Sequence, residues 1–419
     1  METLDNKSRD ILHCDLNNFY ASVECKLFPE LADKYVAVCG NPDARHGIVL
    51  AKNEKAKKCG VATGDVMWEA VKKCPELICV PTHFDEYGKY SKLVRDVYYR
   101  FTDQVEPYGL DECWLDVTAS KKLHGSPREI ADKIRNIVKD EIGLTISVGV
   151  SFTKTLAKLG SDLKKPNATT VLSQNNFKHV AWDLPCGEFF MCGKRTTEKL
   201  RKMNIFTIGN IASAPDHILK KTLGINGLKL KREANGISDE VVNFAENIPP
   251  PQSVGHGVTT NRDLNCEEEA IALIFALSAH VASRLRRYDL CGKKVSVSVK
   301  NNRLESVTRQ TLMPFYSANE NEIATECVKL YKSFYDIENS LPIRAISIGV
   351  ASLLPIDVLA QDSTERNACE DKILNLDKKI DGIRDRYGFD SLVKASSLDS
   401  AFNLSGKTSD DKILPFKRR

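Results

Sequence analysis

The stretch Tyr108–Val117, with the sequence YGLDECWLDV, contains two adjacent carboxylates, Asp111 and Glu112, where the chain leaves a turn and enters an apolar strand. An acidic pair of this kind is more often a solvated turn than a functional site. A third carboxylate changes that balance, because Asp15 follows another short apolar run, Ile11–Cys14, far upstream. Two strands that each end in carboxylate favour a divalent-metal site at one edge of a sheet.

Length and composition indicate a multidomain chain without a membrane or disulfide signature. At 419 residues the chain is too long for one ordinary core, so about two to four domains are expected. Its 60 basic and 56 acidic residues give a net charge of +4, which points to no particular class of partner. The 13 cysteines form no CxxC pair, which argues against zinc ribbons and a disulfide framework. We see no signal peptide and no membrane-length apolar run, so we expect a cytoplasmic protein without membrane contact.

Apolar periodicity gives the first part of the chain the order strand, helix, strand, helix, strand. The first strand is Ile11–Leu16, the second belongs to the opening stretch, and the third is the alternating run Thr145–Val150. The helices between them are an aromatic-rich one over Tyr87–Phe101 and one that starts with a capping box at Ser126. A small helical segment is inserted between residues ~25 and ~82, and two further short strands, Tyr35–Cys39 and Gly47–Ala51, fall within it. This order fits a ferredoxin-like α+β sheet that carries an insertion.

Beyond this sheet the sequence predicts a helical segment, a linker and a second mixed domain. Leu184–Val242 shows short helices and glycine turns, whose free N–H groups either bind phosphate or belong to plain helix–turn–helix packing. Pro249-Pro250-Pro251-Gln252 is a stiff linker and the clearest domain boundary. The next pattern is β-α-β-β-α-β, with its first helix capped by Asn265 and Glu268 and running to Arg287. Basic residues surround its strands: Lys293, Lys294, Lys300, Arg303 and Arg309.

The carboxylates suggest metal-assisted phosphate chemistry. Three of them suit two Mg²⁺ ions, because water and substrate phosphates complete the coordination. Two basic helices, Asn53–Lys58 and Lys154–Lys165, could supply charge for a triphosphate. No P-loop, HExxH, GxSxG or Rossmann fingerprint is present, so an ATPase, zinc protease, hydrolase or dehydrogenase has no support. From the residues alone we conclude a metal-dependent enzyme of phosphate chemistry that acts on nucleic acid.

Seven segments also carry a resemblance to a known family. DLNNFYASVE (Asp15–Glu24), GLDECWLD (Gly109–Asp116) and VGVSFTKTLAKLGSDLKKPN (Val148–Asn167) resemble three motifs of the Y-family DNA polymerases, which include bacterial DinB and UmuC. The resemblance continues in the same order to about residue 355, through CGKRTTEKL (Cys192–Leu200), GINGLKLKREANGI (Gly224–Ile237), GHGVTTNRDL (Gly255–Leu264) and PIRAISIGVASL (Pro342–Leu353).

The resemblance implies an α+β multidomain architecture. A ferredoxin-like palm would comprise residues 1–25 and 83–175, with small fingers inserted at 26–82. A helix-hairpin-helix thumb would follow at 176–243, and a linker at 244–254. The β-α-β-β-α-β pattern would be the little finger at 255–355. The tail at 356–419 lies beyond the resemblance, and its apolar spacing predicts one helix at Ile373–Arg386.

The resemblance also implies roles for individual residues. Asp15, Asp111 and Glu112 would hold the two Mg²⁺ ions, helped by the Leu16 carbonyl. Tyr20 would be the steric gate, whose ring fills the space that the 2′-hydroxyl of a ribonucleotide would need.

Two lysines are implied as contacts of the incoming triphosphate. Lys165 would contact it directly. Where DinB proteins have a YEAR-like run, this chain has NEKAK, with Glu54 and Lys57 in place of the usual Tyr and Arg. UmuC has a similar run, so we expect Lys57 to contact phosphate and Glu54 not to.

The implied activity is that of a DNA-directed DNA polymerase, a nucleotidyltransferase of the translesion type with a place in DNA repair and replication past damage. It would add deoxynucleoside triphosphates to the 3′-hydroxyl of primer–template DNA. The alternative is a catalytically inactive, polymerase-like DNA-binding accessory protein. Its mark would be loss of a carboxylate, and all three are present. A sliding clamp is a further partner to consider, but the tail has no clear clamp motif: Gln361-Asp362-Ser363 lacks the apolar residues.

Overall fold

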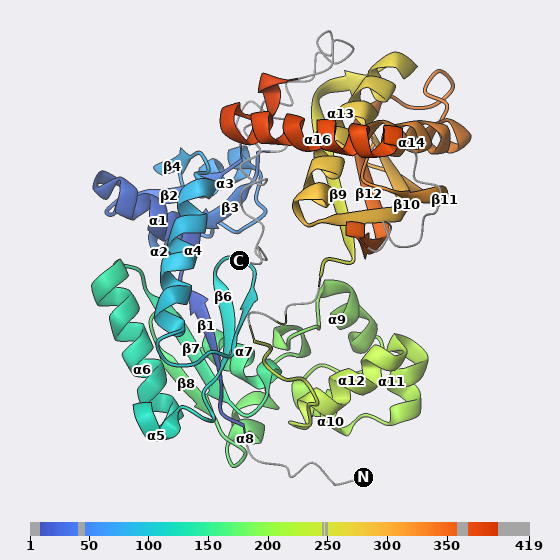
Figure 1. The fold of residues 1–419 in the computed structure, drawn as a ribbon. Coiled ribbons are helices and arrows are strands. Elements are labelled where there is room, and N and C mark those ends of the chain that lie inside the picture. The colour runs from blue at the N-terminus through green and yellow to red at the C-terminus, as the bar shows by residue number, and fades with distance from the viewer. Residues whose placement is uncertain (1–8, 41–46, 245–246, 248–249, 358–367, 393–419) are drawn as a thin grey trace. The chain divides into compact units, whose positions relative to one another are not determined.

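A computed structural model describes residues 9–40, 47–244, 247, 250–357 and 368–392 (Figure 1). The chain divides into two compact units, with the main boundary between residues 248 and 249. That boundary lies at the proline run in which the sequence predicts a linker. Each unit has a hydrophobic core of its own. Among the described helices, none is long and apolar enough to cross a membrane.

A five-stranded sheet forms the centre of unit 1, with the strand order β5-β6-β1-β7-β8. β1 is antiparallel to both β6 and β7, and β8 is parallel to β7. With helix α4 between β1 and β5 and helix α6 between β6 and β7, this is the predicted ferredoxin-like sheet with β8 added at its edge. The bounds are β1 Ile11–Leu16, α4 Phe84–Tyr98, β5 Val105–Tyr108, β6 Glu112–Asp116, α6 Pro127–Ile137, β7 Ile146–Ser151 and β8 Thr169–Leu172.

The two faces of β1 are covered by different helices, so all six of its residues are buried. Leu12 and Cys14 join the core that α4 and α6 complete, and these two helices lie side by side in Figure 1. His13 and Asp15 point the other way, toward α7 (Lys154–Leu163) and the residues just after it. The capping box predicted at Ser126 is present at the start of α6, with Glu129 as its partner.

The inserted segment contains a sheet of its own, in the order β3-β2-β4, beside two short helices, so its description as a small helical segment was wrong. Its two predicted strands are present as β2 and β3. Pattern reasoning missed β4 because a strand of four residues is too short to show a period. The elements are α1 Phe19–Leu27, which precedes the segment, then β2 Tyr35–Cys39, β3 Val49–Lys52, α2 Glu54–Lys58, α3 Met67–Lys73 and β4 Leu77–Val80.

Short helices follow the sheet, as the glycine turns predicted. They pack around a separate apolar cluster that includes Phe189, Leu200 and Leu219. The short helices of the rest of unit 1 are α5 Lys121–His124, α8 Phe177–Ala181, α9 Lys194–Arg201, α10 Ile208–Ser213, α11 Asp216–Leu223 and α12 Ile225–Ala234.

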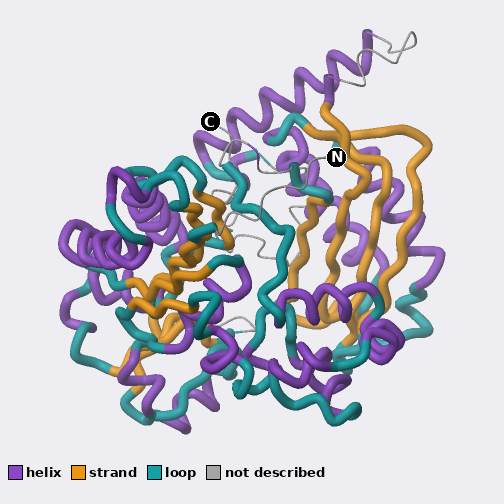
Figure 2. Tube along the Cα trace, turned by 90° about the horizontal axis from the view of Figure 1, so that it is seen from below, coloured by secondary structure: helices purple, strands orange, loops and turns teal. Residues whose placement is uncertain are grey.

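Unit 2 has the predicted β-α-β-β-α-β order, and its four strands form one antiparallel sheet, β11-β10-β12-β9, seen side by side in Figure 2. Val295 and Val297 are buried in the core that α13 and α14 complete, whereas Ser296 and Ser298 between them are half-buried. The elements are β9 Ser253–Leu264, α13 Glu267–Arg287, β10 Leu290–Asn301, β11 Ser306–Ser317, α14 Glu320–Phe334 and β12 Ile343–Pro355.

The predicted cap of α13 was wrong. The N-cap residue is Cys266, whose side chain makes no capping bond. The Asn265 backbone N–H instead donates to Glu269 at 3.4 Å, and Arg262 pairs with the same carboxylate. This ion pair holds Glu269, so the helix begins one residue later than the Asn265–Glu268 pattern indicated.

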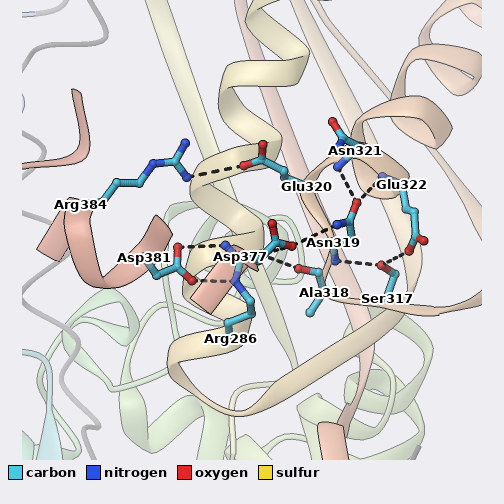
Figure 3. A network of polar contacts seen from close by, with 10 residues as sticks. All are labelled: Arg286, Ser317, Ala318, Asn319, Glu320, Asn321, Glu322, Asp377, Asp381 and Arg384. Carbon is cyan, nitrogen blue, oxygen red and sulfur yellow. Dashed lines mark hydrogen bonds and ion pairs between the residues drawn. The ribbon is translucent and has the colours of Figure 1, made fainter. Parts of the chain in front are cut away.

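The tail helix α16 (Ala368–Tyr387) attaches to unit 2 through a buried polar network (Figure 3). The Arg286 guanidinium on α13 donates to both carboxylate oxygens of Asp381, at 2.6 and 2.9 Å, and to the Ala318 carbonyl at 2.8 Å. Arg384 of α16 lies 3.5 Å from Glu320 at the start of α14. Because both arginines are almost fully buried, these ion pairs make α16 part of unit 2.

Replacing Gly149 with alanine should strongly destabilise unit 1. A Cβ there would lie 1.9 Å from the Ala157 carbonyl oxygen and 2.4 Å from the Ser161 nitrogen, both backbone atoms of α7. We expect Gly149→Ala to lower the free energy of unfolding by about 3 kcal/mol or more. All three tryptophans lie in unit 1, so urea unfolding followed by their fluorescence reports on this unit.

A matched control for this change is Gly193→Ala, because nothing lies within 4 Å of a Cβ at Gly193. It should shift the unfolding free energy by less than about 1 kcal/mol. Equal unfolding curves for Gly149→Ala and the unaltered chain would show that α7 does not pack against β7 as described.

Candidate active site

The pairing of β1 with β6 brings the predicted acidic residues to one edge of the sheet. Asp15 is the direct cross-strand partner of Glu112, and the Leu16 backbone N–H donates to the Asp111 carbonyl at 3.0 Å. Gly109 forms the turn just before them with a φ of 81°, a conformation that glycine adopts without strain. Asp15, Leu16, Asp111 and Glu112 therefore meet although about 95 residues of chain separate the two strands.

Lysines of the α7 region neutralise two of these carboxylates. Lys165 lies 2.8 Å from Asp15, and Lys158 makes a close ion pair with Glu112. Lys158 lies on α7 itself, whereas Lys165 lies just beyond the end of the helix, after its C-cap residue Lys164. Sequence reasoning identified Lys165 through the resemblance but did not single out Lys158.

Within the described part of the chain, no three histidine, cysteine or acidic side chains already converge as ligands of a metal ion. The oxygens of Asp15 and Glu112 are turned toward lysine ammonium groups instead. The donor set itself still suits Mg²⁺, which prefers carboxylate and carbonyl oxygens. A divalent ion at this edge would take over the charge compensation that Lys158 and Lys165 provide.

A buried histidine contacts Glu112 and is itself held by a serine of α7, and sequence reasoning did not identify these contacts. His13 is fully buried and lies with Nε2 3.2 Å from the Glu112 carboxylate. Its Nδ1 lies 2.8 Å from the Ser161 hydroxyl of α7. The only available sequence signal was a histidine inside a buried strand, and such a histidine is more often merely packed.

The three carboxylates differ in proton affinity. Burial, followed by repulsion from Asp15 and Glu112, raises the pKa of Asp111 to about 6. Burial also raises the pKa of Asp15, although Lys165 opposes the shift. Burial acts in the same direction on Glu112, but hydrogen bonds with His13 and Lys158 outweigh it and lower the pKa of Glu112 to about 2. The edge of the sheet is thus crowded with negative charge that a divalent cation would stabilise.

Tyr20 lies in an aromatic cluster between α1 and α4. Its ring stacks on Tyr87 with centroids 4.3 Å apart and an interplanar angle of 14°. Phe84 meets the same ring edge-on, at 5.8 Å and 78°. The orientation of Tyr20 therefore depends on residues of α4 as well as on its own helix.

Lys57 lies apart from the carboxylates, on the inserted segment. Its side chain is about half exposed, and its ion-pair partner is Glu54 at 3.7 Å. Glu54 in turn accepts a hydrogen bond from Asn18 at 3.0 Å, which connects α2 to the turn before α1. The structure thus brings Lys165 to the acidic edge but does not bring Lys57 into contact with it.

Replacing Asp111 with asparagine should stabilise the metal-free protein at neutral pH. The folded-state pKa of Asp111 is raised from 3.8 to about 6, so ionisation costs more in the folded chain than in the unfolded one. The resulting loss of stability develops as the pH rises through this window and is complete above pH 6. We expect Asp111→Asn to add about 2 kcal/mol at pH 7, since one pKa unit corresponds to about 1.4 kcal/mol and solvent screens part of the shift.

Tryptophan-monitored unfolding in the presence of a chelator, repeated between pH 4 and 8, measures this effect. The gain should shrink steeply toward pH 4, where Asp111 is protonated in the folded state and only partly ionised in the unfolded state. Asp103→Asn, which changes an exposed aspartate, should leave the stability unaltered at either pH. A less stable Asp111→Asn protein at pH 7 would contradict the account of charge crowding.

Comparisons with known proteins identify the family of the chain. Residues 14–162 match the model of the impB/mucB/samB family, and residues 251–365 match that of the family's C-terminal domain. DNA polymerase IV of Acetivibrio thermocellus is 43% identical over 92% of this chain and 96% of its own length. DNA polymerase IV of Moorella thermoacetica is 34% identical over 94% and 98%.

A solved structure shares the fold. The Y-family DNA polymerase chimera Dbh-Dpo4(243-245)-Dbh is 22% identical and superposes with a TM-score of 0.71, covering 82% of this chain and 99% of the chimera. Sequence relatives of this coverage and identity establish the family. The chain belongs to the impB/mucB/samB family, the Y-family DNA polymerases, as a bacterial DinB-like member.

Proposed function

We propose that the acidic edge of unit 1 is the catalytic centre of a template-directed DNA polymerase. Family membership makes the chain a DNA-directed DNA polymerase of the translesion type. The observation that carries the assignment of the site is the register of β1 and β6, with Asp15 opposite Glu112 and Leu16 bonded to Asp111. The reaction is in-line attack of a primer 3′-hydroxyl on the α-phosphorus of a deoxynucleoside triphosphate.

Asp15, Asp111, Glu112 and the Leu16 carbonyl would hold two Mg²⁺ ions. When bound, the ions lower the pKa of the attacking hydroxyl and stabilise the leaving phosphate oxygens. The carboxylates supply hard oxygen donors, and the raised pKa values of Asp15 and Asp111 indicate a site that gains from added positive charge. Burial of Asp15, which is 6% exposed, keeps competing water away from its carboxylate.

The lysines of the α7 region would bind the negatively charged triphosphate of the substrate. Lys165 is partly buried and is held by Asp15 and by Asp162, at 2.8 and 2.7 Å. A lysine so held at the acidic edge is well placed to move to the triphosphate once Asp15 has another cation. Lys57, half exposed on α2, would be a second phosphate contact.

Tyr20 would select the sugar. Its ring is fixed by stacking on Tyr87 and by the edge-on contact with Phe84. A ring held in one orientation can exclude a 2′-hydroxyl sterically, whereas a freely rotating ring would yield to it. This selection would favour deoxynucleotides over ribonucleotides.

The domain roles follow the same proposal. Residues 1–25 and 83–175 would be the palm, 26–82 the fingers and 176–243 the thumb, with a linker at 244–254. Residues 255–355 would be the little finger, and 356–419 the tail. The protein would act in the cytoplasm on primer–template DNA. The part of the tail with the weak clamp-motif candidate lies outside the described residues, and no observation favours the inactive accessory protein.

Asp111→Asn should abolish primer extension while the protein remains folded. The substitution removes one of three carboxylates and leaves the volume of the side chain unchanged, so the loss should exceed about a thousandfold in kcat. Extension of a labelled primer with Mg²⁺ and all four deoxynucleotides measures it. Asp103→Asn, with the same change of charge, should extend normally; equal extension by Asp111→Asn and the unaltered chain would refute the site.

DNA binding should weaken steeply with salt and hardly depend on sequence, because phosphate contacts dominate. Lys300 is exposed at the end of β10, on a strand whose buried valines face the helices. Lys300→Gln should reduce the slope of log affinity against log salt by about one.

Fluorescence anisotropy with two unrelated primer–templates measures that slope. Lys329→Gln, on α14 and paired with Glu326, is the control and should leave the slope unchanged. A flat salt titration would argue against phosphate-dominated binding.

A further inference from the structure

The packing of Tyr20 points to residues behind it that set its position. Tyr87 is fully buried, and its ring is the one that stacks on Tyr20. Phe19 and Phe84 also contact the Tyr87 ring, but ring contacts permit more than one offset between stacked rings. The hydroxyl of Tyr87 adds a directional hydrogen bond, which fixes the position of its ring along the stack.

That hydroxyl is bonded to Glu24, which is also fully buried. The Tyr87 hydroxyl donates to the Glu24 carboxylate at 2.5 Å. The same carboxylate meets His83 Nδ1 at 2.9 and 3.0 Å, one oxygen each. Burial, followed by the hydrogen bond to Glu24, raises the pKa of Tyr87, so its hydroxyl remains a proton donor at any physiological pH.

The arrangement closes a ring of contacts between two helices. Tyr20 and Glu24 are one turn apart on α1, and both face α4. His83 and Tyr87 are one turn apart at the start of α4. Tyr20 touches Tyr87 through its ring, and Glu24 holds Tyr87 through its hydroxyl. A shift of Tyr87 along the stack would break the bond to Glu24.

A buried carboxylate at this place needs a reason other than stability. Taking an ionised group out of water costs several kcal/mol, and apolar residues of similar volume often serve a core equally well. Buried polar groups are best attested where they fix one arrangement among several. The alternative is that Glu24 and Tyr87 form an ordinary hydrogen-bonded pair within the core, without influence on Tyr20.

We propose that Glu24 is a positioning residue for sugar selection, acting through the Tyr87 hydroxyl on the ring of Tyr20. This inference rests on the proposed role of Tyr20 as steric gate. Glu24 and Tyr87 hold the gate in the orientation that excludes a 2′-hydroxyl. Without the bond between them, Tyr20 can give way and admit a ribonucleotide.

The test is a gain of ribonucleotide incorporation, which unfolding cannot produce. Tyr87→Phe keeps the stacked ring and removes only the hydroxyl, and Glu24→Gln keeps the size of the side chain and removes its charge. Each should raise kcat/KM for CTP opposite a template guanine by roughly tenfold relative to that for dCTP, equivalent to about 1.4 kcal/mol. The double variant should gain no more than the larger single change, because both act through one bond.

Two further variants separate the possible failures. Tyr98→Phe removes the hydroxyl of another buried tyrosine on α4 and should leave the ratio unchanged. Tyr20→Ala should lower the preference for dCTP further than either Tyr87→Phe or Glu24→Gln.

If Tyr20→Ala changes the ratio but Tyr87→Phe and Glu24→Gln do not, the gate stands and the role of Glu24 is refuted. An unchanged ratio in Tyr20→Ala would refute the gate itself and the inference with it. Additive gains in the double variant would show that Glu24 acts by another route than Tyr87. If Glu24→Gln fails to fold, the result for Tyr87→Phe alone decides.

Discussion

The antiparallel pairing of β1 with β6 is the constraint on which the rest of unit 1 depends. Its register makes Asp15 face Glu112 and bonds Leu16 to Asp111, so acids from two distant segments share one edge. All six residues of β1 are buried, so each face of the strand is packed. Shifting the register of β1 by one residue would exchange the side chains of its two faces, and the packing on both faces therefore opposes such a shift. The same packing that the core requires therefore fixes the geometry of the acidic edge.

The carboxylates at this edge repel one another, and lysines of the α7 region partly compensate their charge. Lys158 and Lys165 each pair with one acid, while Asp111 has no lysine partner and the raised pKa that follows from burial and like charges. The close contact of α7 with β7 at Gly149 makes this compensation possible, because the lysines reach the acids only when the helix lies against the sheet. The charge compensation at the edge thus depends on the packing of α7 against β7.

The sequence predicted most of the architecture because its periodic segments are long and its acids end apolar runs. The ferredoxin-like order, the β-α-β-β-α-β order and the start of α6 at Ser126 all follow from local pattern. What it could not predict depends on tertiary contact. The strands β4 and β8 have four residues each and gain their hydrogen bonds from neighbours, and the Arg262–Glu269 pair moved the cap of α13.

The limits are similar at the candidate site. Asp15, Asp111 and Glu112 meet as expected, since strand ends are visible in sequence. Lys165 was expected to contact a triphosphate, and in the structure it lies against Asp15. The roles of His13 and Ser161 were not visible, because a buried histidine has the same pattern whether it packs or supports a carboxylate. The functions of these residues remain proposals. Only the contacts from Ser161 on α7 through His13 on β1 to Glu112 on β6 distinguish the two cases.

The attachment of α16 bears on the order in which the protein can mature during synthesis. Arg286 is buried on α13, yet its principal partner, Asp381, lies 95 residues further along the chain. Until that residue has left the ribosome, the Arg286 guanidinium lacks its main counter-charge, although α13 can already pack against β9, β10 and β12. Full burial of Arg286 therefore waits for a segment that is made well after α13, and a chain that stopped before α16 would leave this guanidinium exposed on the surface of the unit.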